Sequence, residues 1–257
     1  MAHDHSITHQ NKEYFDKEAA TYDTRHGELI QKLTNAIRDN VDVIGADWKK
    51  ANATDEQVSA QPVRLLDYAC GTGMVSRTLG EYVDQCVGID LSPQMVEVYN
   101  KRAQEDDHSP DQWHAVQGDL TADPSTPAST DLSSAEFHSF DIAAVGGGFH
   151  HFADPQLAAA RLVERLRPGG VLAIWDFLTH PGHDTHGHAS AHTIAKHGFS
   201  EQELRDMFTS AGAGEGFAIV DLGEFDFANH GKSFKRQCVI ARGRKPGAAG
   251  AAEGASL

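Results

Sequence analysis

The stretch LLDYACGTGMVS, residues 65–76, decides the fold that we expect for this chain. It opens with an apolar run that ends in a carboxylate, which is typical of a buried strand. Gly71 and Gly73 then allow a tight turn, and the following residues begin a helix whose first N–H groups have no partner within the helix. A strand, a glycine turn and a helix in this order predict a site for a nucleotide-like ligand.

Strand and helix patterns alternate on both sides of this stretch. A helix is expected over 27–44, where Leu29, Leu33, Ile37 and Val41 are spaced four apart. Strands are expected over 63–67, 86–90, 112–117, 140–145, 171–177, 216–222 and 234–241, and further helices over 74–83, 93–105, 154–166 and 200–211. This alternation predicts an α/β fold built on one seven-stranded, mostly parallel sheet with helices on both faces.

The composition excludes several classes of partner. A formal net charge of −15 disfavours nucleic acid and anionic membrane surfaces, which are bound through Lys and Arg. No apolar run resembles a secretory signal or a membrane span, and three scattered cysteines do not form a disulfide framework. We therefore expect a cytoplasmic protein that binds neither nucleic acid nor membranes.

Three carboxylates follow expected strands, where open α/β sheets bind their ligands. Asp67 precedes the glycine turn, and Asp90 ends the next strand, where a carboxylate can accept hydrogen bonds from both hydroxyls of a ribose. Asp119 comes after the third strand and can accept one from an adenine amino group. An isolated glycine turn often only tightens a loop, but the three carboxylates favour a ligand site.

At this point the sequence resembles the class I S-adenosylmethionine (SAM)-dependent methyltransferases, close to the ubiquinone-biosynthesis type of small-molecule enzyme. The resemblance rests on segments that occur in the order and spacing of the family: LLDYACGTG, VGIDLSPQMVEVY, QGDL, FDIAAVGGGFHHFADP and LRPGGVLAIWDF, followed by the closing pattern HGFSEQELRDMFTSAG. It implies a Rossmann-like fold, SAM as cofactor and an N-terminal helical lid.

The resemblance also implies which residues surround SAM. They are Asp67, Ala69, Gly71 and Gly73 at the methionine moiety, Asp90, Leu91 and Met95 at the ribose and adenine, Asp119 and Leu120 at the adenine, and Gly146 at the sulfonium side. Ala69 stands where many members have glycine. Ser76 stands where a dinucleotide-binding fingerprint needs a third glycine, which weakens the reading as an NAD(P)-dependent oxidoreductase.

The N-terminal part supplies aromatic side chains before the sheet begins. Tyr14, Phe15 and Tyr22 lie within residues 11–23. In enzymes of this family such a segment folds over the cofactor, and aromatic faces stabilise a sulfonium cation; alternatively, these rings anchor a helix to the core. We assign residues 1–44 to this lid, 45–61 to a polar connector, 62–243 to the methyltransferase domain and 244–257 to a disordered tail.

Histidines supply the candidate catalytic groups. His150 and His151 follow the fourth strand on the expected acceptor side, where an imidazole can act as general base for a hydroxyl, thiol or amine. One or both can instead hold the loop by hydrogen bonds. His192 and His197 compete for the same role, because they end the histidine-rich segment that follows the fifth strand.

That segment, HPGHDTHGHASAHTIAKH, holds six histidines within residues 180–197. A metal site is one reading, but the spacing matches no fixed tetrahedral pattern, and a hard cation would need carboxylates such as Asp154 or Asp176. A solvated loop is another. We favour a cover, residues 180–198, over the acceptor side, and we predict no metal ligand.

The predicted function is transfer of a methyl group from SAM to an O, N or S atom of a small molecule. The alternatives are an NAD(P)-dependent oxidoreductase and a non-catalytic SAM-binding regulator. The identity of the acceptor and the oligomeric state are left open.

Overall fold

The computed structural model describes residues 2–49, 61–123, 130–179, 193–229 and 232–247. Its strands are β1 (Arg64–Tyr68), β2 (Gln85–Asp90), β3 (Trp113–Gln117), β4 (Phe140–Gly146), β5 (Leu166–Phe177), β6 (Glu215–Asn229) and β7 (Lys232–Arg244). They form one sheet in the order β3-β2-β1-β4-β5-β7-β6, in which β7 runs antiparallel to both of its neighbours. The predicted seven-stranded, mostly parallel sheet is confirmed.

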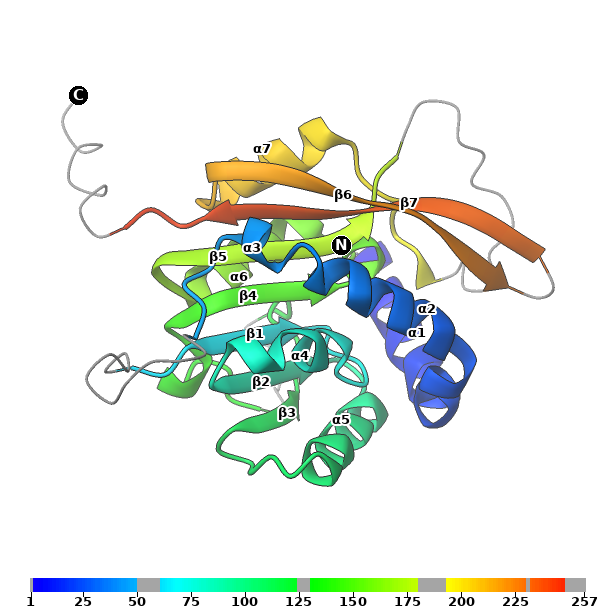
Figure 1. The fold of residues 1–257 in the computed structure, drawn as a ribbon. Helices are drawn as coiled ribbons and strands as arrows, with labels where there is room; N and C mark the ends of the chain where they lie inside the picture. The colour runs from blue at the N-terminus through cyan, green and yellow to red at the C-terminus, as the bar shows by residue number, and fades with distance from the viewer. Residues whose placement is uncertain (1, 50–60, 124–129, 180–192, 230–231, 248–257) are drawn as a thin grey trace.

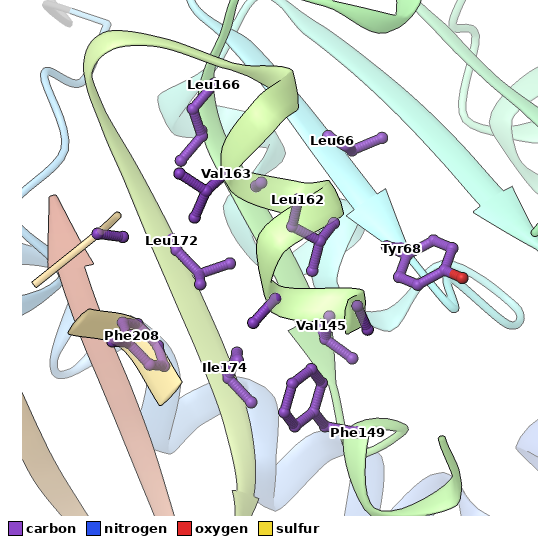
Figure 2. Packing of buried hydrophobic residues seen from close by; sticks show 14 of the residues in the cluster. Leu66, Tyr68, Val145, Phe149, Leu162, Val163, Leu166, Leu172, Ile174 and Phe208 are labelled. Carbon is purple, nitrogen blue, oxygen red and sulfur yellow. The ribbon is translucent and has the colours of Figure 1, made fainter. Parts of the chain in front are cut away.

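Helices cover both faces of this sheet. The described α-helices are α1 (Ala2–Glu18), α2 (Tyr22–Arg38), α3 (Val41–Ile44), α4 (Met74–Leu79), α5 (Pro93–Glu105), α6 (Pro155–Arg165) and α7 (Glu201–Ala211), and the short 3-10 turns are η1 (Ala19–Thr21), η2 (Gly80–Tyr82), η3 (Ala135–Phe137) and η4 (Phe149–His151). Side chains of α6 and α7 pack on one face, where Figure 2 shows Leu162 and Val163 against Leu172 of β5. The second apolar cluster joins α2, α3, α4 and α5 to the other face.

Alternating side chains of β5 explain the two clusters. Leu172 and Ile174 belong to the first cluster, whereas Val171, Ala173 and Trp175 belong to the second. Because successive side chains of a strand point to opposite faces, a strand covered on both sides reads as one continuous apolar run. This is the reason why VLAIW was recognisable as a strand.

The chain order places a ligand site at one edge of the sheet. From β1 the chain moves outward through β2 to β3, then returns to β4 beside β1 and continues to β5. Ligands of open α/β sheets bind at such a switch point, outside the carboxyl ends of the strands. Figure 1 shows α1 and α2 beyond the arrowheads of the central strands, so these two helices cover that edge.

Local sequence signals account for helix starts. The Ser92 side chain accepts a hydrogen bond from the Met95 N–H, and Pro93 is the first residue of α5. Ser200 and Glu203 form a reciprocal capping box at the start of α7. Both arrangements satisfy N–H groups that a helix leaves unpaired at its first turn.

Several boundaries differ from the prediction. The helix expected over 27–44 is split into α2, which begins at Tyr22, and α3, while the polar start of the chain forms α1. Helix α1 has only scattered apolar residues, so its sequence lacks the stripe that marks an amphipathic helix. Strand β5 begins at Leu166, at the end of the helix expected over 154–166 and before the strand expected over 171–177.

The closing strands are also longer than predicted. Strand β6 runs past Gly223, which has φ +92° at a register shift, and continues through Phe225 and Phe227. A bulge of this kind interrupts the alternation that identifies a strand, although pairing with β7 continues beyond it. The segments 50–60, 180–192 and 248–257, which contain most of the connector, most of the histidine-rich segment and most of the tail, lie outside the described residues.

Candidate active site

A cavity of about 1340 Å³ lies at the carboxyl ends of the central strands. Its walls come from the glycine turn after β1, the ends of β2, β4 and β5, helices α1 and α2, and the β6–β7 hairpin. Small-molecule sites usually measure about 300–1000 Å³. This cavity therefore has room for two small ligands side by side.

Asp90 connects the glycine turn to the end of β2. Its Oδ2 accepts a hydrogen bond of 2.8 Å from the Gly71 N–H, and its Oδ1 accepts one of 2.8 Å from the Ser92 N–H. Burial raises the pKa of Asp90 to about 6, despite these hydrogen bonds to its charged form. The carboxylate is thus fixed at the cavity wall and is ionised at neutral pH.

Asp119 lies in the same half of the cavity, after β3. Its Oδ1 accepts hydrogen bonds from the Tyr68 hydroxyl at 3.0 Å, the Thr121 N–H at 2.8 Å and the Thr121 hydroxyl at 2.7 Å. Within the described ranges its Oδ2 accepts none, so this oxygen can receive a donor from a ligand. Leu91, Met95 and Gly118 also line the cavity.

Three residues that the resemblance placed at the cofactor do not line the cavity: Asp67, Gly73 and Leu120. The Oδ2 of Asp67 accepts hydrogen bonds from the N–H and the hydroxyl of Ser76, and burial raises its pKa to about 7. Gly73 caps α4 with φ +90° and lies against the Tyr99 ring, and Leu120 belongs to the core. These three residues therefore do not contact the cavity directly.

The N-terminal helices close this half of the cavity. Tyr14 and Tyr22 line it, and burial, followed by the nearby charges of Asp23 and Asp90, raises the pKa of Tyr22 to about 12. Asp23 accepts a hydrogen bond of 2.6 Å from the Thr72 hydroxyl and forms ion pairs with Arg77 and Arg102.

A second contact involves Asp16 of α1, which accepts a hydrogen bond of 2.6 Å from the Ser92 hydroxyl. Asp16 and Asp23 therefore attach the N-terminal helices to both loops that hold Asp90. The helices lie where a lid over the cofactor half of the cavity would lie (Figure 1).

His150 lies in the other half of the cavity, in the turn η4 after β4. Its backbone N–H donates to the Asp176 Oδ2 at 3.0 Å, and its Nδ1 lies 3.0 Å from the Asp176 Oδ1. Asp176 ends the neighbouring strand β5, and both residues are buried. Because a carboxylate only accepts hydrogen bonds, the His150 Nδ1 donates to Asp176.

His151 has a different environment. Its Nδ1 lies 2.8 Å from the Thr193 carbonyl oxygen, its carbonyl accepts a hydrogen bond of 2.9 Å from the Asn11 side chain, and its ring contacts Phe15 edge-on. His151 therefore joins α1 to the segment that ends the histidine-rich stretch. His197 is described but does not line the cavity, and His192 lies outside the described residues.

The glycine turns leave the space that a bound cofactor needs. A Cβ atom added to Gly71 or Gly147 would meet nothing within 4 Å, although both glycines line the cavity. Ala69 has φ +54°, a left-handed conformation that glycine adopts more easily, which explains why glycine is common at this position in the family it resembles. The open backbone and the two carboxylates fit the methionine moiety, ribose and adenine of SAM.

Comparison with known proteins agrees with this geometry. Residues 66–174 match the family model described as "Methyltransferase domain". This region is a methyltransferase domain. The sheet, the family match and the relatives support a class I SAM-dependent methyltransferase domain with SAM as its cofactor.

Relatives of this methyltransferase domain include proteins with different descriptions. An uncharacterized methyltransferase from Schizosaccharomyces pombe is 32% identical over 64% of this chain and 54% of its own length. The demethylmenaquinone methyltransferase of Deinococcus radiodurans is 30% identical over 59% of this chain and 61% of its own length. The chain therefore matches only about half to three-fifths of the length of these relatives.

A solved structure supports the fold over a larger part of the chain. The SAM-dependent methyltransferase from Thermotoga maritima aligns with 90% of this chain and 98% of its own, at a TM-score of 0.57 and 18% identity. At this identity the likeness concerns the fold. It extends beyond the methyltransferase domain to the N-terminal helices or the closing hairpin, because that domain covers only residues 66–174.

Several site residues were not identified from the sequence. The sequence pattern indicates Asp176 only as a potential metal ligand, and it gives no signal for the contacts of Asn11, Asp16 and Asp23. Asp176 could have been found, because it is an acid at the carboxyl end of a strand in the sheet that carries the site. Nothing in the local sequence marks the other three, since their partners are far away along the chain.

Proposed function

We propose that this protein transfers a methyl group from SAM to an O, N or S atom of a small-molecule acceptor. The observation that carries the proposal is the continuity of the cavity, since one space joins the carboxylates Asp90 and Asp119 to the buried pair of His150 and Asp176. A methyl donor in the first half would thus face an acceptor in the second.

Each part of the cavity has a role in this proposal. Asp90 accepts hydrogen bonds from the ribose hydroxyls, Asp119 accepts one from the adenine amino group, and the backbone near Ala69 and Gly71 receives the methionine moiety. Bound SAM supplies a methyl group on a positively charged sulfur. The rings of Tyr14 and Tyr22 stabilise that charge, and His150 takes the proton of the acceptor.

Alignment and exclusion of water supply most of the catalysis in a displacement of this kind. The contacts of Asp16 and Asp23 hold α1 and α2 over the site, and they therefore assist both. Two observations favour a small acceptor. The formal charge of −15 disfavours polyanions, and one relative is a demethylmenaquinone methyltransferase, whose name states a small molecule.

The proposal is tested by incubating the protein with SAM and a library of phenols, alcohols, thiols and amines. We expect release of S-adenosylhomocysteine that depends on one acceptor class, with the methylated product identified by mass spectrometry. The Asp90→Asn variant is the control, because any S-adenosylhomocysteine that it still releases at the wild-type rate does not come from this site. SAM binding without methylation of any acceptor would favour a regulator, and binding of NAD(P) instead of SAM would favour an oxidoreductase.

A further inference from the structure

We propose that Asp176 is a positioning residue that holds His150 with its proton on Nδ1, so that Nε2 takes the proton of an uncharged hydroxyl acceptor. The inference rests on the methyl transfer proposed above and goes further in two respects. It assigns a role to Asp176, and it selects an uncharged hydroxyl among the possible acceptors.

The carboxylate of Asp176 fixes both the backbone and the ring of His150. Its Oδ2 accepts the His150 N–H at 3.0 Å, and its oxygens lie 3.0 Å and 3.2 Å from the His150 Nδ1. Asp176 is 4% exposed and His150 is 6% exposed, so water competes little for these hydrogen bonds. The ring is further confined by Phe177, whose centroid is 4.8 Å away.

The second ring nitrogen of His150 is not engaged by the protein in the same way. Within the described part of the chain, Nε2 has no hydrogen-bond partner, and the residue lines the cavity. His151 differs, because its Nδ1 faces a backbone carbonyl and not a carboxylate. The negative charge of Asp176 thus lies directly beside the His150 ring.

The charges around the cavity favour an uncharged acceptor. Each Lys or Arg that lines it within the described ranges is already paired with an acid: Lys12 with Asp16, Arg25 with Glu18 and Lys32 with Glu28. No lysine or arginine there is left to bind a carboxylate or phosphate group, and the buried Asp176 disfavours a second negative charge near His150.

The remaining wall of this half is largely apolar. Helix α2, strand β5 and strand β6 contribute Leu29, Leu33, Ile37, Trp175, Phe177, Leu222 and Phe227. Such a wall suits an acceptor with an apolar body. A hydroxyl group on such an acceptor is a weak nucleophile until its proton is removed. A positioned histidine can remove that proton as a general base.

In the resulting step, the acceptor oxygen forms a bond to the methyl carbon while the carbon–sulfur bond breaks. The electron pair of the broken bond stays on sulfur, and this removes the positive charge of the donor. The acceptor proton passes to the His150 Nε2, and the carboxylate of Asp176 stabilises the imidazolium until that proton leaves to water. Charge and atoms balance without a metal or a redox partner.

Two measurements test the proposal. The first is the protonation of the histidine ring, observed by ¹H–¹⁵N NMR and assigned to His150 by its loss in the His150→Gln variant. We expect a proton on Nδ1 and none on Nε2 at alkaline pH in the wild type, and loss of this fixed tautomer in Asp176→Asn. A wild-type ring with its proton on Nε2 would overturn the proposal.

The second measurement compares 2-naphthol with 2-naphthalenethiol, which share one apolar body but differ in their need for a base. At a pH where the thiol is ionised, we expect Asp176→Asn to lower kcat for 2-naphthol by roughly 100-fold or more and to change kcat for the thiol little. The affinity for SAM should stay unchanged. Glu224→Gln, at an exposed position of β6, is the matched control and should behave like the wild type.

The outcomes separate the inference from the proposed function. Equal losses of kcat for both acceptors would assign Asp176 a purely structural role, and wild-type enzyme that methylates the thiol but not 2-naphthol would overturn the hydroxyl assignment. Failure to bind SAM would contradict the proposed function, whereas the tautomer of His150 can be measured independently of cofactor and acceptor.

Discussion

Asp90 shows how one side chain combines a structural and a proposed binding role. Its carboxylate accepts backbone N–H groups from the glycine turn and from the loop after β2, and therefore fixes the distance between them. Burial at the cavity wall raises its pKa to about 6. The cofactor site should consequently respond to pH in a range where most carboxylates remain ionised.

We predict that SAM binding weakens below pH 6. Ribose hydroxyls donate more strongly to the ionised form of Asp90 than to the protonated form, so the Kd for SAM should rise about tenfold per pH unit once the group protonates. Calorimetric titrations between pH 5 and pH 8 would measure this change. The Asp90→Asn variant should bind more weakly and with little dependence on pH; a wild-type Kd that is constant down to pH 5 would contradict the ribose assignment.

The sequence predicts those site residues that are marked by the residues next to them in the chain. Asp90, Asp119 and Gly71 line the cavity, and each is recognisable because it immediately follows a strand pattern. The contact between His150 and Asp176 joins residues 26 positions apart and exists only because β4 and β5 are neighbours in the sheet. The roles of all these residues stay predictions.

The position of helices α1 and α2 also depends on tertiary contacts, like the contact between His150 and Asp176. Their inner side chains face the cavity, and their attachment relies on Asp16 and Asp23. Most of the stability of a helix in a protein comes from tertiary packing, so packing and these polar contacts decide whether the two helices stay over the site. Changes in these helices should therefore alter cofactor binding more than the stability of the sheet.

The variant Asp23→Asn should loosen this attachment. An amide can still accept from the Thr72 hydroxyl but loses the ion pairs to Arg77 and Arg102, a loss of about 1 kcal/mol for partly exposed pairs. We expect a several-fold increase in KM for SAM and faster tryptic cleavage within α2. Glu105→Gln, which removes an exposed pair on α5, should change neither measurement; identical behaviour of both variants would argue against a closing role of Asp23.

Two glycines of neighbouring helices should respond in opposite directions to alanine. Gly27 lies in the exposed interior of α2, and an added Cβ would meet nothing within 4 Å, so Gly27→Ala should stabilise the protein by about 0.5–1 kcal/mol. Gly73 has φ +90°, and an added Cβ would lie 2.9 Å from the Tyr99 ring, so Gly73→Ala should destabilise it by about 1–3 kcal/mol. Thermal unfolding followed by circular dichroism measures both.

The sheet was the most predictable part of the molecule. Fully buried parallel strands read as apolar runs between helices, and their order follows from short right-handed connections. The length of the β6–β7 hairpin was underestimated, because the bulge at Gly223 interrupts its alternation. The N-terminal helical lid was expected from the resemblance, but the bounds of α1 have no periodic signal, because its hydrogen bonds to Ser92 and His151 join residues that are distant in sequence.

The arrangement of the whole molecule joins these parts into one functional unit. The switch point between β1 and β4 opens a cavity, the N-terminal helices cover it, and the hairpin supplies its far wall. Within the described residues no helix is long and apolar enough to cross a membrane. Ligand entry and lid movement would occur at the carboxyl ends of the strands of this sheet.

Binding of SAM to this cavity is the claim on which the account depends, and isothermal titration calorimetry of the protein with SAM and with S-adenosylhomocysteine tests it most directly. We predict one saturable site for each ligand, with an affinity that falls strongly in Asp90→Ala. Absence of binding by both ligands, or the same affinity in the wild type and in Asp90→Ala, would contradict the account.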